Sequence, residues 1–379
     1  MFFGMEQIAS AVSSSSPDLL KLLVDHCIKG SLLILLAWAI TRLLKDKPAA
    51  IRHFVWTLSI TAVVMLPLWS AIMPAIKAPI LPGNLFEEEI VTAISSAEVE
   101  ASVAGEETSS VANNFTLNWQ SSVVYIWLAG AIAAFLWLLI GKVRAWRMLI
   151  MAHALDDETL LDVARVAADQ IGLRPGWKIK VSDEVNVPLV VGNFGRTVLL
   201  PEEAYDWTRE KLLILLLHEM THIKRRDMLF QIPAELGTVF FWFNPLVWYA
   251  AHKQILEREL AADDHVLNKG VKVSDYATQL LEAANCLKRS SLKALSGAGM
   301  ARGADFKQRL VKVLSTETNR KPLEKRYSAL IIMAITLMAL PLSAWQTWGD
   351  LEDPMLLDDD NFVTAMDVLF SDVVEEDPE

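Results

Sequence analysis

The chain has 379 residues, of which 53% are hydrophobic, and it carries a formal net charge of −11. This composition is too apolar for an ordinary soluble enzyme and favours a membrane protein. The negative charge excludes nucleic acid as the main partner, because a phosphate backbone requires a basic surface. The two cysteines form no C-x-x-C pair, which argues against a disulfide framework or a cysteine-rich zinc site.

Four apolar stretches are long enough to cross a bilayer, which takes about 20 helical residues. They lie near Cys27–Leu44, Phe54–Met73, Val123–Gly141 and Ser328–Trp345. The chain before the first stretch carries Glu6 and Asp18 rather than a basic cluster, so a cleaved signal peptide is the poorer interpretation.

The charges of the connecting segments predict the orientation of these spans, because basic loops stay in the cytoplasm. Basic residues gather between the first two spans, after the third and before the fourth: Arg42, Lys45, Lys47, Arg52, Lys142, Arg144, Arg147, Arg320, Lys321, Lys325 and Arg326. We therefore expect residues 142–326 to form a cytoplasmic domain.

The remaining segments are expected on the other side of the membrane. Residues 1–74 hold the first two spans, 123–141 the third and 327–345 the fourth, whereas 75–122 and 346–379 are acidic. These acidic segments and the N-terminus are predicted to be extracytoplasmic. Composition further predicts a flexible linker over Glu87–Asn114 and a disordered tail over 350–379.

Residues 142–326 carry signals for both helix and strand. We expect an amphipathic helix over Asp157–Ile171 that ends at Gly172, and then three short strands. The strands are Lys178–Val181, Pro188–Val191 and Thr197–Leu200. A free strand edge would pair with an extended peptide substrate, whereas a sheet without a free edge would be only structural.

The strongest chemical signal is the segment from His218 to His222, which reads H-E-M-T-H. It lies among good helix formers, with Thr208 as the expected N-cap. A spacing of four residues places both imidazoles on one helix face, where they can share a metal ion. We predict that His218 and His222 bind zinc and that Glu219 takes a proton from water. The alternative is two histidines on an ordinary amphipathic helix.

A second acidic segment, E-R-E-L-A-A-D-D, begins at Glu257. Within it, Glu259 and Asp263 are four residues apart, so we predict Glu259 as the third metal ligand. Asp263 would then orient a ligating histidine through its other ring nitrogen. Glu257 is the alternative ligand, and a solvated charged helix face is the competing interpretation. His252, His265 and Tyr276 are candidates for stabilising the oxyanion of the reaction. The alternative is that they are ordinary surface or packing residues.

The apolar stretch Met228–Ala251 separates the two motifs. As one continuous helix it would form a fifth span and would place Glu259 across the membrane from His218. Asn244-Pro245 interrupts it, because the residue before a proline avoids the helical conformation. We therefore expect two helices that meet at this turn, the first of them capped by Asp227.

On these residues the chain resembles the BlaR/MecR-type integral-membrane zinc metallopeptidases, the antirepressor proteases of bacteria. The matching segments are Arg52–Trp56, Leu66–Leu68, Pro188–Gly192, His218–Asp227, Asn244–Trp248 and Glu259–Leu267. The resemblance implies a membrane α-helical fold of four transmembrane helices in the bacterial inner membrane. It also implies an inserted cytoplasmic α+β gluzincin-like domain, a zinc ion, and regulated cleavage of a transcriptional repressor or of the protease itself.

Two departures from the family pattern matter. Ala262 stands where the family commonly has cysteine, and no effect on the metal is expected. The β-lactam sensors of the family carry a penicillin-binding domain after the fourth span. Only about thirty acidic residues follow here, too few for an independent domain, so β-lactam sensing by this chain itself is not expected.

Three functions compete. The favoured one is a membrane-embedded zinc metalloendopeptidase that acts on a protein substrate. Such a protein would contact the lipid bilayer and bind no nucleic acid directly. A homodimer is a possible assembly. A quality-control protease of the HtpX type would instead cut many damaged membrane proteins. A non-catalytic scaffold would hold a structural metal, which Glu219 disfavours because a structural site needs no general base.

Overall fold

The computed structural model describes residues 2–73, 76–82, 119–192, 196–290, 299–315, 319–321 and 323–349. The predicted linker Glu87–Asn114 and the predicted disordered tail 350–379 lie outside these residues. The chain divides into two compact units. One contains Met1–Asp25, Met73–Val124 and Ala344–Glu379, and the other contains His26–Ile72 and Tyr125–Ser343.

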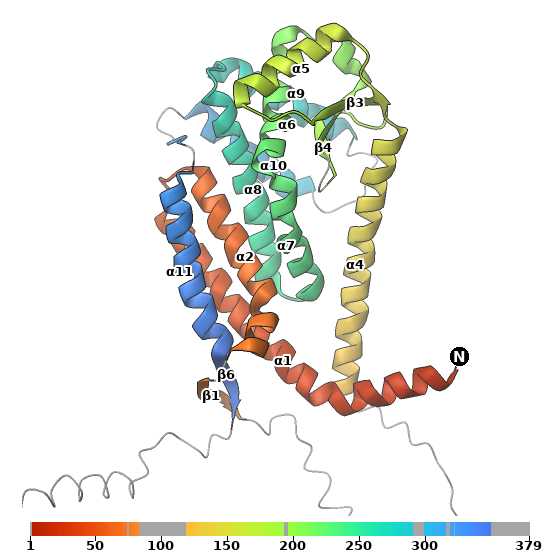
Figure 1. The fold of residues 1–379 in the computed structure, drawn as a ribbon, viewed down its shortest axis with the longest axis vertical. Helices are drawn as coiled ribbons and strands as arrows, with labels where there is room; N and C mark the ends of the chain where they lie inside the picture. The colour runs from red at the N-terminus through yellow and green to blue at the C-terminus, as the bar shows by residue number, and fades with distance from the viewer. Residues whose placement is uncertain are drawn as a thin grey trace, which may run out of the picture. The chain divides into compact units, whose positions relative to one another are not determined.

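The first unit contains a small sheet (Figure 1). Its strand β1 (Ile76–Pro82) pairs in parallel with β6 (Trp345–Gly349). Along the chain, β1 follows helix α2 (Ala49–Ile72) and β6 directly follows helix α11 (Lys325–Ala344). Each of these two apolar helices is therefore followed by one strand of the same pair.

Three helices in the described part of the chain are long and apolar enough to cross a membrane: Ala49–Ile72, Trp119–Met151 and Arg326–Ala344. The predicted second, third and fourth spans fall within or nearly within them. Helix α4 (Trp119–Met151) extends past the predicted end of the third span at Gly141. The predicted first span, Cys27–Leu44, overlaps the end of α1 (Phe2–Leu43), which is not among the three.

One hydrophobic core of the second unit joins the apolar helices. Figure 1 shows α2, α7 (Asp227–Phe240) and α8 (Pro245–Leu267) side by side. Their packed residues include Trp56, Ile60, Leu66, Ala234, Val247 and Ala250, and Ala339 of α11 belongs to the same core. Close van der Waals packing of such side chains holds apolar helices together, because lipid is as apolar as the side chains themselves.

Helix α4 keeps most of its apolar side chains exposed, as a lipid-facing helix does. It contacts α7 and the following turn at a few places. The Trp127 indole donates to Phe240 O at 3.0 Å, and Lys142 Nζ pairs with Glu235 Oε1 at 2.8 Å. Gly130 leaves the room that the Trp242 ring occupies, since a Cβ there would collide with the ring.

A second core lies around a four-stranded sheet of order β2-β3-β5-β4. The strands are β2 (His153–Ala154), β3 (Lys178–Ser182), β4 (Leu189–Val191) and β5 (Thr197–Pro201). β3 and β5 are parallel, and the other two pairs are antiparallel. The three predicted strands are confirmed, and β4 is an outer strand of this sheet within the described residues.

The helices of this region begin and end as their sequences predict. In α5 (Glu158–Ile171), the Asp157 carboxylate accepts the N–H of Thr159 and Leu160. Gly172 ends the helix at a φ of 67°, a left-handed conformation that glycine adopts at little cost. Helix α6 (Arg209–Arg225) starts at Thr208, whose hydroxyl accepts the N–H of Lys211. Helices α9 (Val273–Ser290) and α10 (Gly299–Leu314) follow later in the chain.

The apolar stretch between the two motifs forms two helices, as predicted. The Asn244 side chain accepts the N–H of Leu246 at 2.9 Å and caps α8. The prediction that Asp227 caps α7 is wrong. Arg226 is the N-cap residue, with a φ of 58° and no side-chain capping bond, because the Asp227 carboxylate binds a histidine instead.

Candidate metal centre

Three side chains from two helices converge in the second unit. His218 and His222 lie on α6, and Glu259 lies on α8. The two Nε2 atoms are 3.2 Å apart, and Glu259 Oε2 lies 3.5 Å from His218 Nε2 and 3.9 Å from His222 Nε2. Tetrahedral ligands about 2.0 Å from zinc lie roughly 3.3 Å from one another. The three donor atoms therefore fit one tetrahedral metal ion.

His222 is oriented by a carboxylate on the far side of its ring. Its Nδ1 lies 2.7 Å from Asp227 Oδ2, and both side chains are buried. Burial opposes ionisation of Asp227, but the bond with His222 and the charge of Arg225 outweigh it, so the pKa of this carboxyl is lowered. An ionised Asp227 accepts a hydrogen bond from the Nδ1–H of His222 and so leaves Nε2 unprotonated and free to bind a metal.

His218 is held in a similar way through a tyrosine. Its Nδ1 lies 2.9 Å from the Tyr276 hydroxyl, which donates to Asp263 Oδ1 at 2.5 Å. Asp263 Oδ1 is itself 3.4 Å from His218 Nδ1. Burial and the charge of Asp263 raise the pKa of Tyr276 well above its usual value, so the hydroxyl keeps its proton. Each histidine thus has its second nitrogen engaged by buried polar groups.

Two arginines surround the acidic side chains. Arg309 on α10 donates to both oxygens of Asp263, at 2.7 and 2.9 Å, and lies 3.4 Å from Glu259 Oε2. Arg258 donates to Glu259 Oε1 at 2.9 Å. Burial acts against the charge of Glu259, but the histidines and these arginines hold its pKa well below the usual range. The carboxylate is therefore ionised and able to bind a cation.

Glu219 lies between the two histidines in sequence and is half-buried. Burial raises its pKa, against the opposing charges of His218 and His222. Within the described residues its carboxylate makes no hydrogen bond or ion pair. A carboxyl group in this state is available to accept and return a proton.

The structure separates the other predicted candidates from this cluster. Glu257 forms a buried pair with Arg52, with atoms 2.7 and 2.8 Å apart, so it is not part of the cluster. His252 pairs with Asp305 at 3.1 Å. Tyr276 contacts the outer nitrogen of His218 rather than the open side of the cluster.

Sequence reasoning missed the contacts of Asp227, Arg258 and Arg309. Asp227 lies five residues after His222, and this spacing could have indicated their contact. The interpretation of Asp227 as a helix cap took its place. Arg309 is 46 residues from Asp263 and has no local pattern that reveals the contact. It reaches the centre only because α10 packs on α8 and α9.

Comparison with known proteins gives one family. A family model described as BlaR1 peptidase M56 matches residues 21–313. The regulatory protein BlaR1 of Bacillus licheniformis is 26% identical over 222 residues, which cover 57% of this chain and 36% of that protein. The methicillin resistance mecR1 protein of Staphylococcus aureus is 22% identical over 234 residues, 59% of this chain and 39% of that protein. The chain thus spans less than half the length of these relatives.

Proposed function

Because this chain belongs to the BlaR1 peptidase M56 family, we propose that it is a membrane-embedded zinc metalloendopeptidase. Its ligands are His218, His222 and Glu259, and Glu219 is its general base. One observation carries the proposal: the three donor atoms lie 3.2 to 3.9 Å apart, with the unpaired Glu219 on α6 beside the two histidines. This arrangement supports a catalytic zinc site, which takes three protein ligands and keeps a fourth position open.

The donor set suits zinc in particular. Two imidazoles and one carboxylate form a common catalytic zinc set, and a gluzincin-like site has its glutamate downstream of the two histidines. Asp227 and Tyr276 fix the orientation of the two rings. A zinc ion bound here would polarise the scissile carbonyl and lower the pKa of a water molecule.

In the proposed reaction, Glu219 transfers the proton of the attacking water. The Glu219 carboxylate accepts a proton from the attacking water as the water adds to the scissile carbonyl carbon. It returns that proton to the amine nitrogen as the peptide C–N bond breaks. Asp263, held by Arg309, and Asp227, held by Arg225, keep the two imidazoles in place during both transfers.

The sheet supports a peptide as the substrate. β4 is an outer strand of the described sheet, and it contacts α6, the helix of the two histidines. An extended peptide would add to this edge through backbone hydrogen bonds and lie beside the centre. Backbone pairing gives affinity without demanding one side-chain sequence, which fits a protease.

We place the site on the cytoplasmic side of a bacterial inner membrane. Basic residues lie at or near the start of α2, the end of α4 and the start of α11, as expected for cytoplasmic loops. The chain would have four spans, with the end of α1 as the first and both termini outside. The described relatives are named as regulatory and resistance proteins, so the role we propose is regulated cleavage of a repressor-like protein.

Three proteins in nanodiscs test this function: the wild type, Glu219→Gln, and Glu210→Gln as a control from the exposed first turn of α6. Each should bind about one zinc ion. Wild type and the control should cut themselves or a co-expressed repressor-like protein, and Glu219→Gln should not. Full proteolysis by Glu219→Gln would refute its role, and zinc binding without proteolysis by any of them would favour the scaffold.

A further inference from the structure

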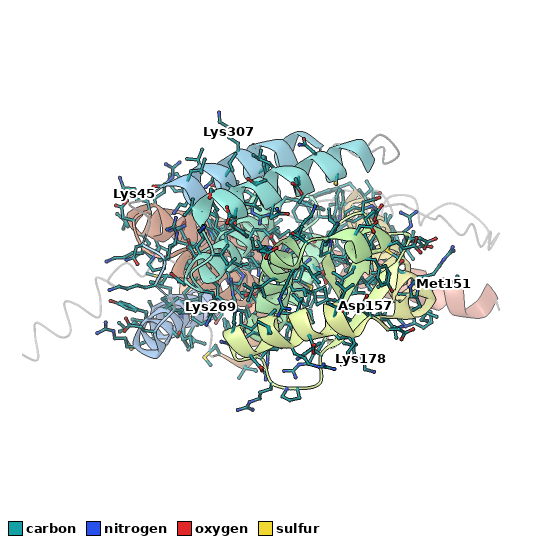
Figure 2. The ribbon with its side chains drawn as sticks, turned by 90° about the horizontal axis from the view of Figure 1, so that it is seen from above. Lys45, Met151, Asp157, Lys178, Lys269 and Lys307 are labelled. Atoms are coloured by element: carbon teal, nitrogen blue, oxygen red, sulfur yellow. The ribbon has the colours of Figure 1, made fainter. Side chains whose placement is uncertain are left out.

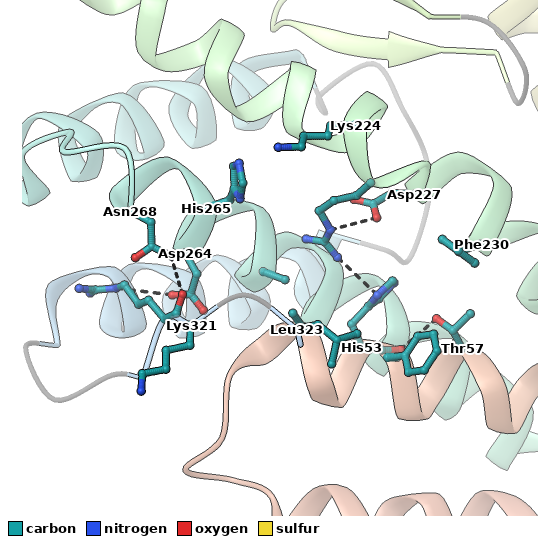
Figure 3. Close-up of a pocket in the computed structure, with 15 residues that line it drawn as sticks. His53, Thr57, Lys224, Asp227, Phe230, Asp264, His265, Asn268, Lys321 and Leu323 are labelled. Atoms are coloured by element: carbon teal, nitrogen blue, oxygen red, sulfur yellow. Dashed lines mark hydrogen bonds and ion pairs between the residues drawn. The ribbon is translucent and has the colours of Figure 1, made fainter. Parts of the chain in front are cut away.

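A cavity of about 420 Å³ is lined in part by Asp227, the residue that binds His222 of the metal centre (Figure 3). Its walls come from the start of α2, the end of α6, the start of α7, the end of α8 and the segment before α11. Of the proposed metal ligands and base, none lines it. The cavity is therefore separate from the proposed catalytic site, although it lies close to it.

The charged lining is mainly basic. Lys224, Arg225, Arg320 and Lys321 face two carboxylates, those of Asp227 and Asp264. Both carboxylates already have a basic partner, because Asp227 pairs with Arg225 at 3.3 Å and Asp264 with Arg320 at 3.5 Å. The two lysines remain in excess. The Lys321 side chain is exposed and makes no hydrogen bond or ion pair within the described residues, while Lys224 uses one of its three donor positions on a carbonyl oxygen.

Buried polar atoms without a hydrogen bond gather at this cavity. Six such side-chain atoms occur in the described part of the chain, and three of them belong to lining residues: Asp227 Oδ1, His265 Nε2 and Arg320 Nε. The first and third take part in the ion pairs given above, but His265 Nε2 has neither kind of contact. Burial lowers the pKa of His265 to about 4, so its ring is neutral and its free nitrogen has unused hydrogen-bonding capacity. Such an unsatisfied atom points to a missing polar ligand.

A further part of the lining is mainly apolar and belongs largely to a candidate membrane span. Ala50, His53, Phe54 and Thr57 lie on the first turns of α2, and the apolar side chains of Phe230 and Leu323 add to this part. The cavity thus joins a basic part to an apolar part at the start of a membrane helix. An amphiphile with an anionic headgroup matches both parts, and basic pockets between cytoplasmic helix ends bind such headgroups.

We propose that this cavity binds the headgroup of an anionic phospholipid. The phosphate faces Lys224, Lys321 and His265, and the first carbons of the acyl chains lie along α2 at Phe54. The bound headgroup also lies beside Arg225 and Asp227, and Asp227 holds His222. Lipid binding can be measured without measuring proteolysis. The lipid proposal can therefore be tested independently of the proposed function.

The experiment uses the full chain, delipidated in detergent, and counts bound lipid by native mass spectrometry. Dioleoyl phosphatidylglycerol is compared with dioleoyl phosphatidylcholine, which has the same acyl chains and no net charge. The variants are Lys321→Glu, on the exposed rim, and Lys224→Gln, which removes a charge but can still donate to a carbonyl. Lys307→Glu on α10 is the control, with the same charge change on a side chain that projects outward (Figure 2) and does not line the cavity.

We expect the wild type to bind phosphatidylglycerol more tightly than phosphatidylcholine. Lys224→Gln should weaken phosphatidylglycerol binding about fivefold and Lys321→Glu by at least as much, while Lys307→Glu changes nothing. Equal binding of the two lipids, or an equal loss in Lys307→Glu, would overturn the site. Displacement of phosphatidylglycerol by millimolar inorganic phosphate would show that a soluble anion is the ligand and would overturn the lipid assignment.

Discussion

Asp227 Oδ2 lies 2.7 Å from His222 Nδ1, with both side chains buried. The aspartate is the first residue of α7, and the histidine is in the last turn of α6. One hydrogen bond therefore joins α7, a helix of the apolar bundle, to a proposed zinc ligand. It also selects the tautomer of His222 whose Nε2 can bind the metal.

Asp227→Asn should weaken zinc binding by about 10- to 100-fold, because the amide is a poorer acceptor for the His222 proton than the carboxylate. Competition with a chelating dye measures the affinity. Asp275→Asn, at an exposed position of α9, is the matched control and should bind zinc like the wild type. Equal affinities for all three proteins would show that the Asp227 contact does not support the metal.

Glu259→Ala and Glu257→Gln should have opposite effects on zinc content and stability. Glu259→Ala removes a proposed ligand and should lower zinc occupancy. Glu257→Gln should keep zinc but destabilise the fold by about 3–5 kcal/mol, because it leaves the buried Arg52 guanidinium without its partner charge. Metal analysis and thermal unfolding in detergent separate the two effects. Loss of zinc from Glu257→Gln alone would instead make Glu257 the ligand.

Metal removal should lower the melting temperature without unfolding the chain. A ligand that binds only the folded state stabilises it by mass action, so a chelator removes that contribution. The remaining polar groups stay paired, since Arg258 and Arg309 still contact Glu259. The wild type should lose several degrees on chelation, and a His218→Ala, His222→Ala double variant should lose none. A chelator-induced shift of equal size in the double variant would contradict the site.

Asp264 should make stability fall as the pH rises from about 4 to about 6. Burial raises the pKa of its carboxyl from 3.8 to about 6, although Lys312 and Arg320 oppose this. The protonated form is favoured by folding, so its contribution is complete below 3.8 and is lost as the pH passes about 6. Asp264→Asn should remove this loss, on the order of 2–3 kcal/mol. Melting temperatures of both proteins between pH 4 and pH 7 measure it, and parallel curves would contradict the prediction.

Local patterns predicted the local structure well. The predicted cap at Thr208, the predicted helix that begins near Asp157 and the predicted break at Asn244-Pro245 all depend on residues within three positions of one another. The spacing of His218 and His222 follows from helix geometry alone. Such features are settled by neighbouring residues, so a single sequence contains enough information to predict them.

The long-range contacts were not predictable from these patterns. Arg52 meets Glu257 across 205 positions, and this pairing removes Glu257 from the ligand candidates. Arg309 meets Asp263 only through the packing of α10. Asp227 is a different case, because it lies only five residues from His222 and binds that ring instead of capping α7. Where a polar side chain has both local and distant partners, the sequence does not indicate which one prevails.

Helices α6 and α7 are separated by one residue, Arg226, in a left-handed conformation with a φ of 58°. The two helices are therefore joined by a very short connection, so a movement of one would be passed to the other. α7 packs on α2 within the apolar bundle, and α6 carries both histidines. Because Asp227 binds His222, a change in the tilt of α7 relative to α6 would also move the imidazole of a proposed zinc ligand.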